Sequence, residues 1–333
     1  MAVRAAARYL ALGVLLAATQ PLLAGEALYI RNTGPVAGLF GLPALRGDTR
    51  AAAGHWQLAL HGSLASHYVS EERGDELLNF DGETGRLALE WRFGLAPDWE
   101  IQLELPWLRH SGGHLDGPIE QWHQLWNNTD GGRSRVADDQ LSYGYRSDPF
   151  SATDDFLLQD ERSGFGDPSL ALSHRFYHGE RSALSLSLGY KFGVADAQQF
   201  LGSGADDAWL ALRGSAAVTD SFDLYGQFGL LHAGRGDLLP EVQERDLWFA
   251  GLGMDWWFVR HWALLLQLDA HAAPADSAIK GLGEDALLGS AGLRWRADAR
   301  WEVELAIAED LATETAPDVT LLASFRYRPA ARP

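Results

Sequence analysis

The stretch WEIQLELPW, residues 99–107, places large apolar side chains at every second position. Glu100, Gln102 and Glu104 occupy positions between them. Such alternation is typical of a β-strand, because successive side chains of a strand point to opposite faces of the sheet. The run therefore predicts a strand with one apolar face and one strongly polar face.

The same alternation recurs along most of the chain. Eleven further segments show it, at 55–70, 86–95, 168–177, 183–193, 207–218, 222–232, 247–258, 262–271, 286–296, 301–309 and 318–328. Short connections such as "APD" and "VRH" alternate with long ones, at 70–85, 109–167, 194–206, 233–246, 272–284 and 310–317. Short turns on one side and long loops on the other are typical of an outer-membrane β-barrel.

A soluble β-sandwich also has alternating strands, but it fits this chain less well. Its strands average about 5–6 residues, whereas these approach the ~9–11 that cross a bilayer. Aromatic residues such as Trp99, Trp262 and Trp301 also crowd the short-turn ends, as in an interfacial girdle. The sequence thus predicts an all-β, 12-stranded antiparallel transmembrane barrel in the Gram-negative outer membrane, with both termini on the periplasmic side.

Closure of the barrel explains the glutamates of the opening stretch. A membrane-spanning sheet must close, because lipid offers its backbone no hydrogen-bond partners. The apolar side chains then face lipid and the polar ones face the lumen. The residues predicted to line the lumen are Glu90, Arg92, Glu100, Gln102, Glu104, Arg175, Lys191, Arg213, Asp223, Gln227, Asp255, Gln267, Asp269, Arg294, Glu302, Glu304 and Arg326.

These lumen charges are expected to pair. Symmetric closure of the hairpin at 295–301 puts Arg294 opposite Glu302, and Arg326 can reach Glu302 from the last strand. One interpretation is structural neutralisation of buried charges. The other is a polar path or a ladder of substrate-binding groups. Twelve strands lie between filled 8-stranded barrels and open 16-stranded porins, which predicts a narrow or plugged lumen.

The chain divides into four parts. Residues 1–24 carry Arg4 and Arg8 before a short apolar run, and they predict a signal peptide. Residues 25–53 are rich in Gly and Pro and lack alternation, so we expect a periplasmic tail or a segment inserted into the lumen. Residues 54–328 form the predicted barrel, and 329–333 are a C-terminal tail.

Loop 109–167 is far longer than a hairpin requires, and loops of that length are usually functional or disordered. It carries apolar residues among its acids, and Ile119, Trp122 and Trp126 have helical spacing. We expect it to fold over the external mouth as a lid, with a disordered acidic loop as the alternative. The predicted lid residues are Trp122, Trp126, Phe150 and Phe156.

Composition narrows the partners. The chain of 333 residues has no cysteine and a formal net charge of −18, which argues against disulfides, thiolate metal sites and nucleic acid. Neighbours among His55, His61 and His67 lie about 20 Å apart along one strand, too far to share a metal. The sequence predicts no cofactor, metal site or catalytic residue. The expected partners are outer-membrane lipid, lipopolysaccharide and a small-molecule solute.

Three functions fit a barrel of this kind. Passive transport or binding of a small molecule, hydrophobic ones included, is the first. A lipid-modifying enzyme is the second, but its candidate pair, Ser66 and His232, falls on the first and seventh strands, at opposite sides of a 12-stranded barrel. A structural or adhesive surface barrel is the third.

Several motifs resemble a proteobacterial family of outer-membrane barrels, domain of unknown function 3187. They are "GLFGLP" at 38–43, the run at 81–116, "IEQWHQLW" at 119–126 and "SGFGDPSLALSHRF" at 163–176. The resemblance supports the barrel and supplies no catalytic residues. The "GFGD" that opens a strand also resembles barrels associated with a meta-pathway of phenol degradation, which implies uptake of small hydrophobic compounds.

Overall fold

The computed structural model describes residues 25–48, 50–115, 117, 139–148, 155–311 and 314–329. The predicted signal peptide, most of the lid loop with Trp122, Trp126 and Phe150, and the last four residues lie outside these ranges.

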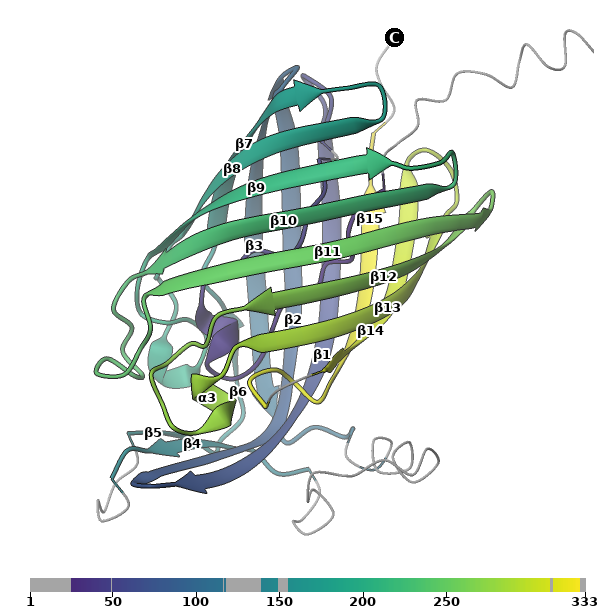
Figure 1. Cartoon of the computed structure of the whole chain (residues 1–333). Helices are drawn as coiled ribbons and strands as arrows, with labels where there is room; N and C mark the ends of the chain where they lie inside the picture. Colours follow the sequence, from purple (N-terminus) through teal and green to yellow (C-terminus); the bar gives the residue numbers. More distant parts are fainter. Residues whose placement is uncertain are drawn as a thin grey trace, which may run out of the picture.

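Twelve antiparallel strands form a closed barrel (Figure 1). The β1–β15 pairing closes it, with Leu58 opposite Tyr327 and Ser66 opposite Val319. β3 pairs directly with β7 across the long loop. The predicted 12-stranded fold is confirmed. The barrel strands are β1 (Trp56–Arg73), β2 (Glu76–Ala96), β3 (Trp99–Ser111), β7 (Ser169–His178), β8 (Ser182–Lys191), β9 (Asp207–Ala217), β10 (Phe222–Ala233), β11 (Asp246–Val259), β12 (Trp262–His271), β13 (Ala286–Arg296), β14 (Trp301–Asp310) and β15 (Val319–Tyr327).

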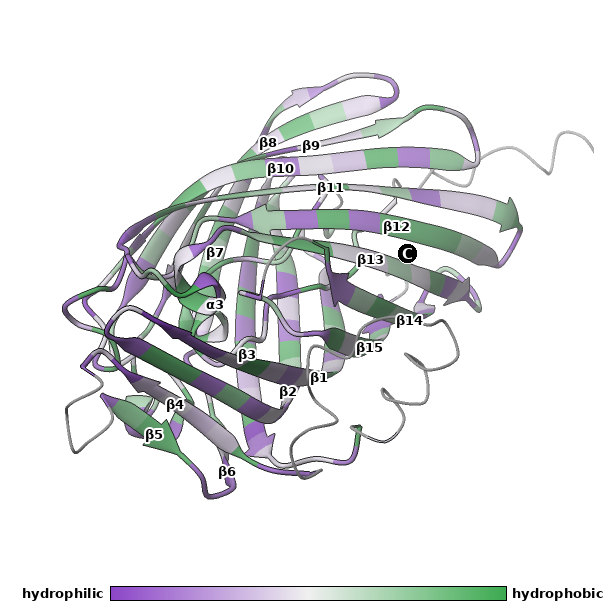
Figure 2. Cartoon of the chain, turned by 60° about the horizontal axis from the view of Figure 1, so that its bottom comes forward, coloured by the Kyte–Doolittle hydropathy of each residue, from purple (hydrophilic) through white to green (hydrophobic). Residues whose placement is uncertain are grey.

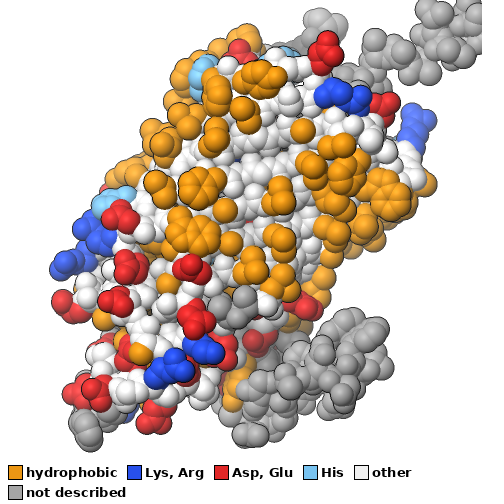
Figure 3. Space-filling model, viewed as in Figure 1, with side chains coloured by type: hydrophobic (Ala, Val, Ile, Leu, Met, Phe, Trp, Pro, Cys, Tyr) orange, Lys and Arg blue, Asp and Glu red, His pale blue; other side chains and the backbone are white. Residues whose placement is uncertain are grey.

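The outer wall of the barrel is apolar, as the alternation predicts. On β3, Leu105 is 41% exposed whereas its neighbour Glu104 is 5% exposed. Apolar side chains cover the wall between a charged loop end and the opposite turn end (Figure 3). Tryptophans gather at the turn end, where the rings of Trp301 and Tyr327 lie 4.2 Å apart. So large an exposed apolar surface requires an apolar surrounding.

One predicted register is wrong. Arg294 lies opposite Glu304, and Arg296 lies opposite Glu302. The reason is the turn, where Asp298 accepts hydrogen bonds from the backbone N–H groups of Arg300 at 2.7 Å and Trp301 at 3.0 Å. This turn displaces the register by two residues, and its N–H donors lower the pKa of Asp298. Arg326 does lie opposite Glu302, on the other side of β14.

The predicted loop 70–85 is also wrong, because β1 and β2 continue through it. They are 18 and 21 residues long, and Arg73 pairs with Glu76 around a two-residue turn. Gly74, at φ +62°, supplies the left-handed conformation that this turn needs. The hairpin thus extends past the other strands at the loop end of the barrel (Figure 1).

Three short strands add to this extension. β4 (Ser142–Arg146) pairs with β2, β5 (Phe156–Leu158) pairs with β4, and β6 (Arg162–Phe165) pairs with β3. They lie at the loop end with the short helix α3 (Lys280–Gly283), as Figure 2 shows from below. The described residues also include two 3₁₀ turns, η1 (Ala37–Leu39) and η3 (Ala197–Gln199). Among the described residues, no helix is long and apolar enough to span a membrane.

Candidate functional site

Residues 25–48, which we call the plug, lie inside the barrel (Figure 1). Their contacts reach strands all around the wall. The Gly25 amide donates to Asp223 of β10 at 3.1 Å, and Arg31 pairs with Glu104 of β3 at 2.9 Å. The plug runs toward the loop end and returns, so that Arg46 comes back to within 3.7 Å of Glu26.

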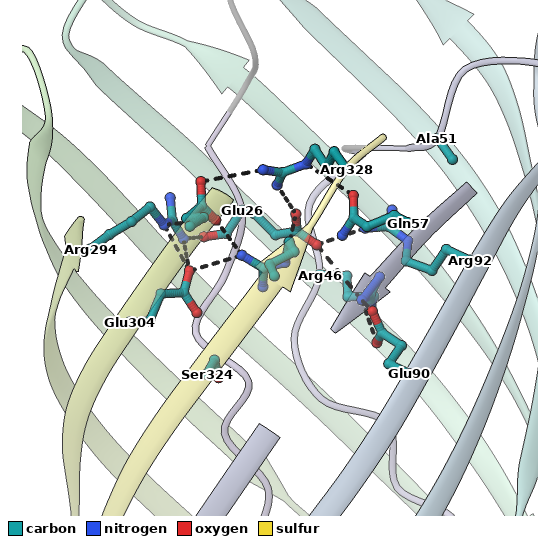
Figure 4. A network of polar contacts seen from close by, with 12 residues as sticks. Glu26, Arg46, Ala51, Gln57, Glu90, Arg92, Arg294, Glu304, Ser324 and Arg328 are labelled. Carbon is teal, nitrogen blue, oxygen red and sulfur yellow. Dashed lines mark hydrogen bonds and ion pairs between the residues drawn. The ribbon is translucent and has the colours of Figure 1, made fainter. Parts of the chain in front are cut away.

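Glu26 is the centre of the plug's contacts near the turn end (Figure 4). Its carboxylate pairs with Arg92 at 2.7 Å and with Arg328 at 3.1 Å. Arg326 and Arg46 lie 3.6 and 3.7 Å from it. One plug carboxylate thereby joins β2, β15 and both limbs of the plug.

The arginines around Glu26 are each held by a second acid. Arg46 pairs with Glu90 at 2.6 Å, and Arg92 pairs with Glu100 at 3.0 Å. Arg326 pairs with Glu302, and Arg328 lies 3.5 Å from the same carboxylate. The attraction between charges paired in this way offsets much of the cost of removing them from water.

A second cluster lies on the wall beside the first. Arg294 is fully buried and pairs with Asp255 and Glu304, each at 2.7 Å, with Glu302 at 3.4 Å. Its guanidinium also donates to the backbone carbonyl of Glu26. The wall therefore contacts the plug backbone as well as its side chains.

Midway along the lumen, the contacts combine aromatic and charged groups. The ring of Tyr29 stacks on His61 of β1, with ring centroids 3.8 Å apart. Arg86 of β2 donates to the Tyr29 hydroxyl at 2.8 Å and pairs with Glu104 at 2.5 Å. Arg31 shares the same Glu104, so one wall carboxylate serves two guanidinium groups.

Nearer the loop end, Lys191 of β8 holds the plug. Its ammonium pairs with Asp207 at 3.0 Å and Asp167 at 3.2 Å, and it donates to the carbonyl of Leu39 at 2.9 Å. The Gly41 amide donates to Asp207 at 2.7 Å. Lys191 and Asp207 therefore fix the loop-end part of the plug through its backbone.

An apolar cluster, which we call the external cap, lies beyond Lys191 toward the loop end of the barrel. Phe156 of β5 packs on Phe200, with ring centroids 5.2 Å apart, and on Phe80 of the extended hairpin at 6.3 Å. Plug residues Leu39 and Phe40 belong to the same buried cluster. Burial and Glu76 together raise the pKa of Tyr145 in this cap.

The residues predicted to line the lumen are shielded from solvent to different degrees. Most are buried, and Gln102, Arg175 and Asp269 are half-buried. Arg175 lies at the turn-end rim, where it pairs with Asp98 at 3.0 Å. Of the predicted lid residues, the structure describes Phe156, which is buried in the external cap.

Sequence reasoning did not identify the plug residues that pair with the wall. Glu26, Arg31 and Arg46 stand in a Gly- and Pro-rich stretch without periodicity. The available signal was charge, because every lumen carboxylate needs a cation and the plug offers two arginines.

The other candidate chemistry does not assemble among the described residues. Ser66 of β1 is buried, whereas His232 of β10 is exposed and bonded to Asp246 at 2.7 Å. Their strands are six positions apart around the barrel, so they form no nucleophile–base pair. No group of three or more His, Cys, Asp or Glu in the described ranges could hold a metal ion.

A closed barrel with an apolar outer wall and a charged interior is an outer-membrane β-barrel, and this protein is one. More particularly, the chain belongs to the family described as "Protein of unknown function (DUF3187)", whose sequence profile matches residues 12–328. The predicted family and the bacterial outer membrane location are thereby confirmed.

The fold is similar to a solved outer membrane channel from Pseudomonas putida F1, with a TM-score of 0.56 and 12% identity over 85% of this chain and 98% of that one. The CymD monoaromatic hydrocarbon channel matches with a TM-score of 0.43 and 11% identity over 92% of this chain and 99% of that one. No curated protein sequence matches this chain.

Proposed function

We propose that this protein is a gated passive channel for small molecules, and that the plug is its gate. The structure described here is the closed state. The plug fills the lumen, and the external cap covers the loop-end mouth. Opening requires the plug to move relative to the wall.

The polarity of the interface between plug and wall carries this proposal. Glu26, Arg31 and Arg46 meet the wall through ion pairs. A buried ion pair contributes little net stability compared with an apolar contact, because water solvates the separated charges well. When the plug moves and water enters, the same wall groups become the lining of a polar pathway.

The external cap is the second element of the gate in this proposal. Its apolar contacts between Phe156, Phe200 and Phe80 hold the described part of loop 109–167 over the mouth. Lipid and lipopolysaccharide are the proposed partners of the outer wall, and a small solute is the proposed partner of the lumen.

A reversible disulfide tests the gate, because the chain has no cysteine of its own. A Cβ built on Gly47 of the plug lies 3.5 Å from the Cβ of Ser215 on β9, within the ~3.5–4.5 Å range of disulfides. The variant Gly47→Cys/Ser215→Cys is reconstituted in planar bilayers, and single-channel currents are recorded before and after reduction. Gly47→Cys alone is the matched control.

We expect the oxidised double variant to stay closed and the reduced form to open like the single variant. Equal currents before and after reduction would show that solutes pass without plug movement. No current from the wild type, the reduced variant and a folded chain lacking residues 25–48 would reject the channel altogether. A heat-modifiable gel shift checks that each variant has folded.

A further inference from the structure

Arg213 of β9 is a buried cation without an acid. The residue is 4% exposed, and no hydrogen bond or ion pair joins its guanidinium to another described residue. Its Nε is buried without a partner. Removing an unpaired charge from water costs roughly several kcal/mol in a protein. Arg213 therefore does not contribute to stability through an ion pair, and its presence in the wall requires a different explanation.

The acids around Arg213 are already engaged. Glu90 pairs with Arg46 at 2.6 Å, and Glu100 pairs with Arg92 at 3.0 Å. These four charges largely cancel one another. Arg213 therefore keeps an uncompensated positive charge on the inner wall.

The guanidinium contacts an aromatic ring. It lies 5.2 Å from the ring centroid of Trp209 on the same strand, which is a cation–π contact. The Trp209 ring lies over Gly189 of β8, in space that any larger side chain at that position would occupy. Gly189 and Trp209 are directly paired in the sheet. Strands β8 and β9 thus build an aromatic shelf beside the arginine.

A cavity lies between this shelf and the plug. The volume of the cavity is about 40 Å³, which is enough for a few water molecules at ~10–15 Å³ each. Arg213 and Trp209 line it with apolar Leu39, Leu108 and Leu201. The other charged side chains that line it are engaged in ion pairs: Arg31 and Arg86 with Glu104, Lys191 with Asp167, and Arg46 with Glu90. The cavity therefore combines one unpaired guanidinium with an aromatic face, leucine side chains and ion-paired charges.

We propose that Arg213 binds the carboxylate of a small organic anion with an apolar body, and that this anion is the solute of the channel. This inference deepens the proposed function, and the claim that the bound anion is also the transported solute rests on that function. A planar guanidinium binds a carboxylate in a bidentate manner, and Trp209 and the leucines contact the apolar body. The closed cavity admits an anion of about acetate size, and plug movement admits a larger one.

Ligand-observed fluorine NMR on the full chain in detergent micelles tests the site without relying on conductance. The probe is 4-fluorobenzoate, and 4-fluorobenzamide is the neutral match. Acetate, added as competitor, tests the smaller anion. The variants are Arg213→Gln and Arg213→Lys, with Arg181→Gln as control, because Arg181 lies at an exposed turn, where it contacts Asp220 and the carbonyl of Ala217.

We expect 4-fluorobenzoate to bind, 4-fluorobenzamide to bind at least 10-fold more weakly, and Arg213→Gln to weaken the anion at least 10-fold (~1.4 kcal/mol). Arg213→Lys should retain part of the affinity. Equal affinity of the two probes, or of wild type and Arg213→Gln, would overturn the site. If anion binding depends on Arg213 but the protein carries no current in bilayers, the binding site is supported and the channel function is rejected.

Thermal unfolding of Arg213→Met separates a ligand site from a structural role. If Arg213 serves a ligand, its removal relieves an unpaired buried charge and leaves the melting temperature unchanged or higher. A melting temperature lowered by several degrees would assign Arg213 to the fold instead.

A second inference concerns Gly25 and rests on separate contacts. Asp223 and Asp255 lie directly opposite each other on β10 and β11. Arg294 pairs with Asp255 at 2.7 Å, whereas Asp223 forms no ion pair with any described residue. The Gly25 nitrogen lies 3.1 Å from Asp223, and a Cβ at Gly25 would collide with the Asp255 carboxylate.

We infer that cleavage after Ala24 makes Gly25 the N-terminal residue, and that its α-ammonium is the missing cation of this acid pair. Hydrolysis of the Ala24–Gly25 peptide bond adds one water, leaves a carboxylate on Ala24 and frees the amine of Gly25. A full positive charge then replaces an amide dipole beside two carboxylates. The processed end thereby anchors the first limb of the plug.

Intact-mass spectrometry of the protein purified from outer membranes tests the site of cleavage. We expect the mass of a chain that begins at Gly25. A chain that begins at Leu28, after the small residue Ala27, would lack Glu26 and overturn the inference. Asp223→Asn should also speed hydrogen exchange in residues 25–31 at least 10-fold, whereas Asp220→Asn should not; equal exchange in both variants would equally reject the anchor.

Discussion

Replacement of Glu26 by Gln is the sharpest test of how the plug is held. The change keeps the size of the side chain and removes the charge that Arg92 and Arg328 contact at 2.7 and 3.1 Å. Removing one partner of a buried ion pair costs about 3–5 kcal/mol when the other is left alone. Here each arginine keeps a second acid, so we expect a loss of about 2–3 kcal/mol in the free energy of plug docking.

This loss should appear as a larger undocked fraction. Since each ~1.4 kcal/mol changes an equilibrium tenfold, the undocked fraction should rise about 30- to 150-fold. Hydrogen exchange of residues 25–48, read by mass spectrometry, measures that fraction where it limits exchange. Open probability in planar bilayers measures it independently.

Asp220→Asn is the matched control for Glu26→Gln. It makes the same carboxylate-to-amide change at an exposed turn, where Asp220 contacts Arg181 at 2.8 Å. We expect wild-type exchange in the plug and wild-type open probability. If Glu26→Gln behaves like this control, the ion pairs around Glu26 do not hold the plug, and the reasoning about the gate fails.

Four further changes test the fold and the cap. Leu103→Arg places a charge on the lipid face and should cost about 2–4 kcal/mol near the midplane, whereas Gln102→Arg faces the lumen and should be milder; equal losses of folded fraction in vesicles would mean that the faces are misassigned. Replacing 112–160 with a short Gly/Ser linker should raise single-channel conductance while the barrel still folds, and unchanged conductance would reject the cap as a constriction. Gly189→Ala should lower stability by about 1–3 kcal/mol through overpacking against Trp209, unlike Gly62→Ala, whose Cβ would come no closer than 3.4 Å to a flexible leucine. Asp298→Ala should destabilise the protein at neutral pH. Because the pKa of Asp298 is lowered in the folded state, the stability difference between variant and wild type should disappear as the pH falls through that pKa. A stability difference that persists in acid would show that the charge of this carboxylate does not stabilise the turn.

Local patterns in the sequence determine the architecture of this protein. In Trp99–Trp107, each residue meets either lipid or lumen, and a membrane imposes that choice at every second position. The twelve strands, the inward direction of Glu100 and Glu104 and the outward direction of Leu103 and Leu105 follow from this one constraint. Loop lengths then assign the two ends of the barrel.

Features that depend on hydrogen bonds at single turns were not predictable from the alternation. The register between Arg294 and Glu304 depends on Asp298, whose carboxylate selects one turn among several of similar length. The continuation of β1 and β2 through 70–85 depends on pairing with β4 and on burial of Phe80 in the external cap. Neither β4 nor the rest of the external cap is adjacent to residues 70–85 in sequence, so no local pattern predicts that the two strands continue.

The plug was decided by tertiary structure alone. Residues 25–48 have no periodicity, because an irregular segment surrounded by wall on all sides meets no repeating environment. Glu26 contacts Arg92, Arg326 and Arg328, which stand 66 to 302 positions further along the chain. The sequence alone determined that the lumen is charged. Only the closed barrel decided that wall residues pair with one another and with Glu26, Arg31 and Arg46 of the chain's own N-terminal segment, and that Arg213 is left without an acid.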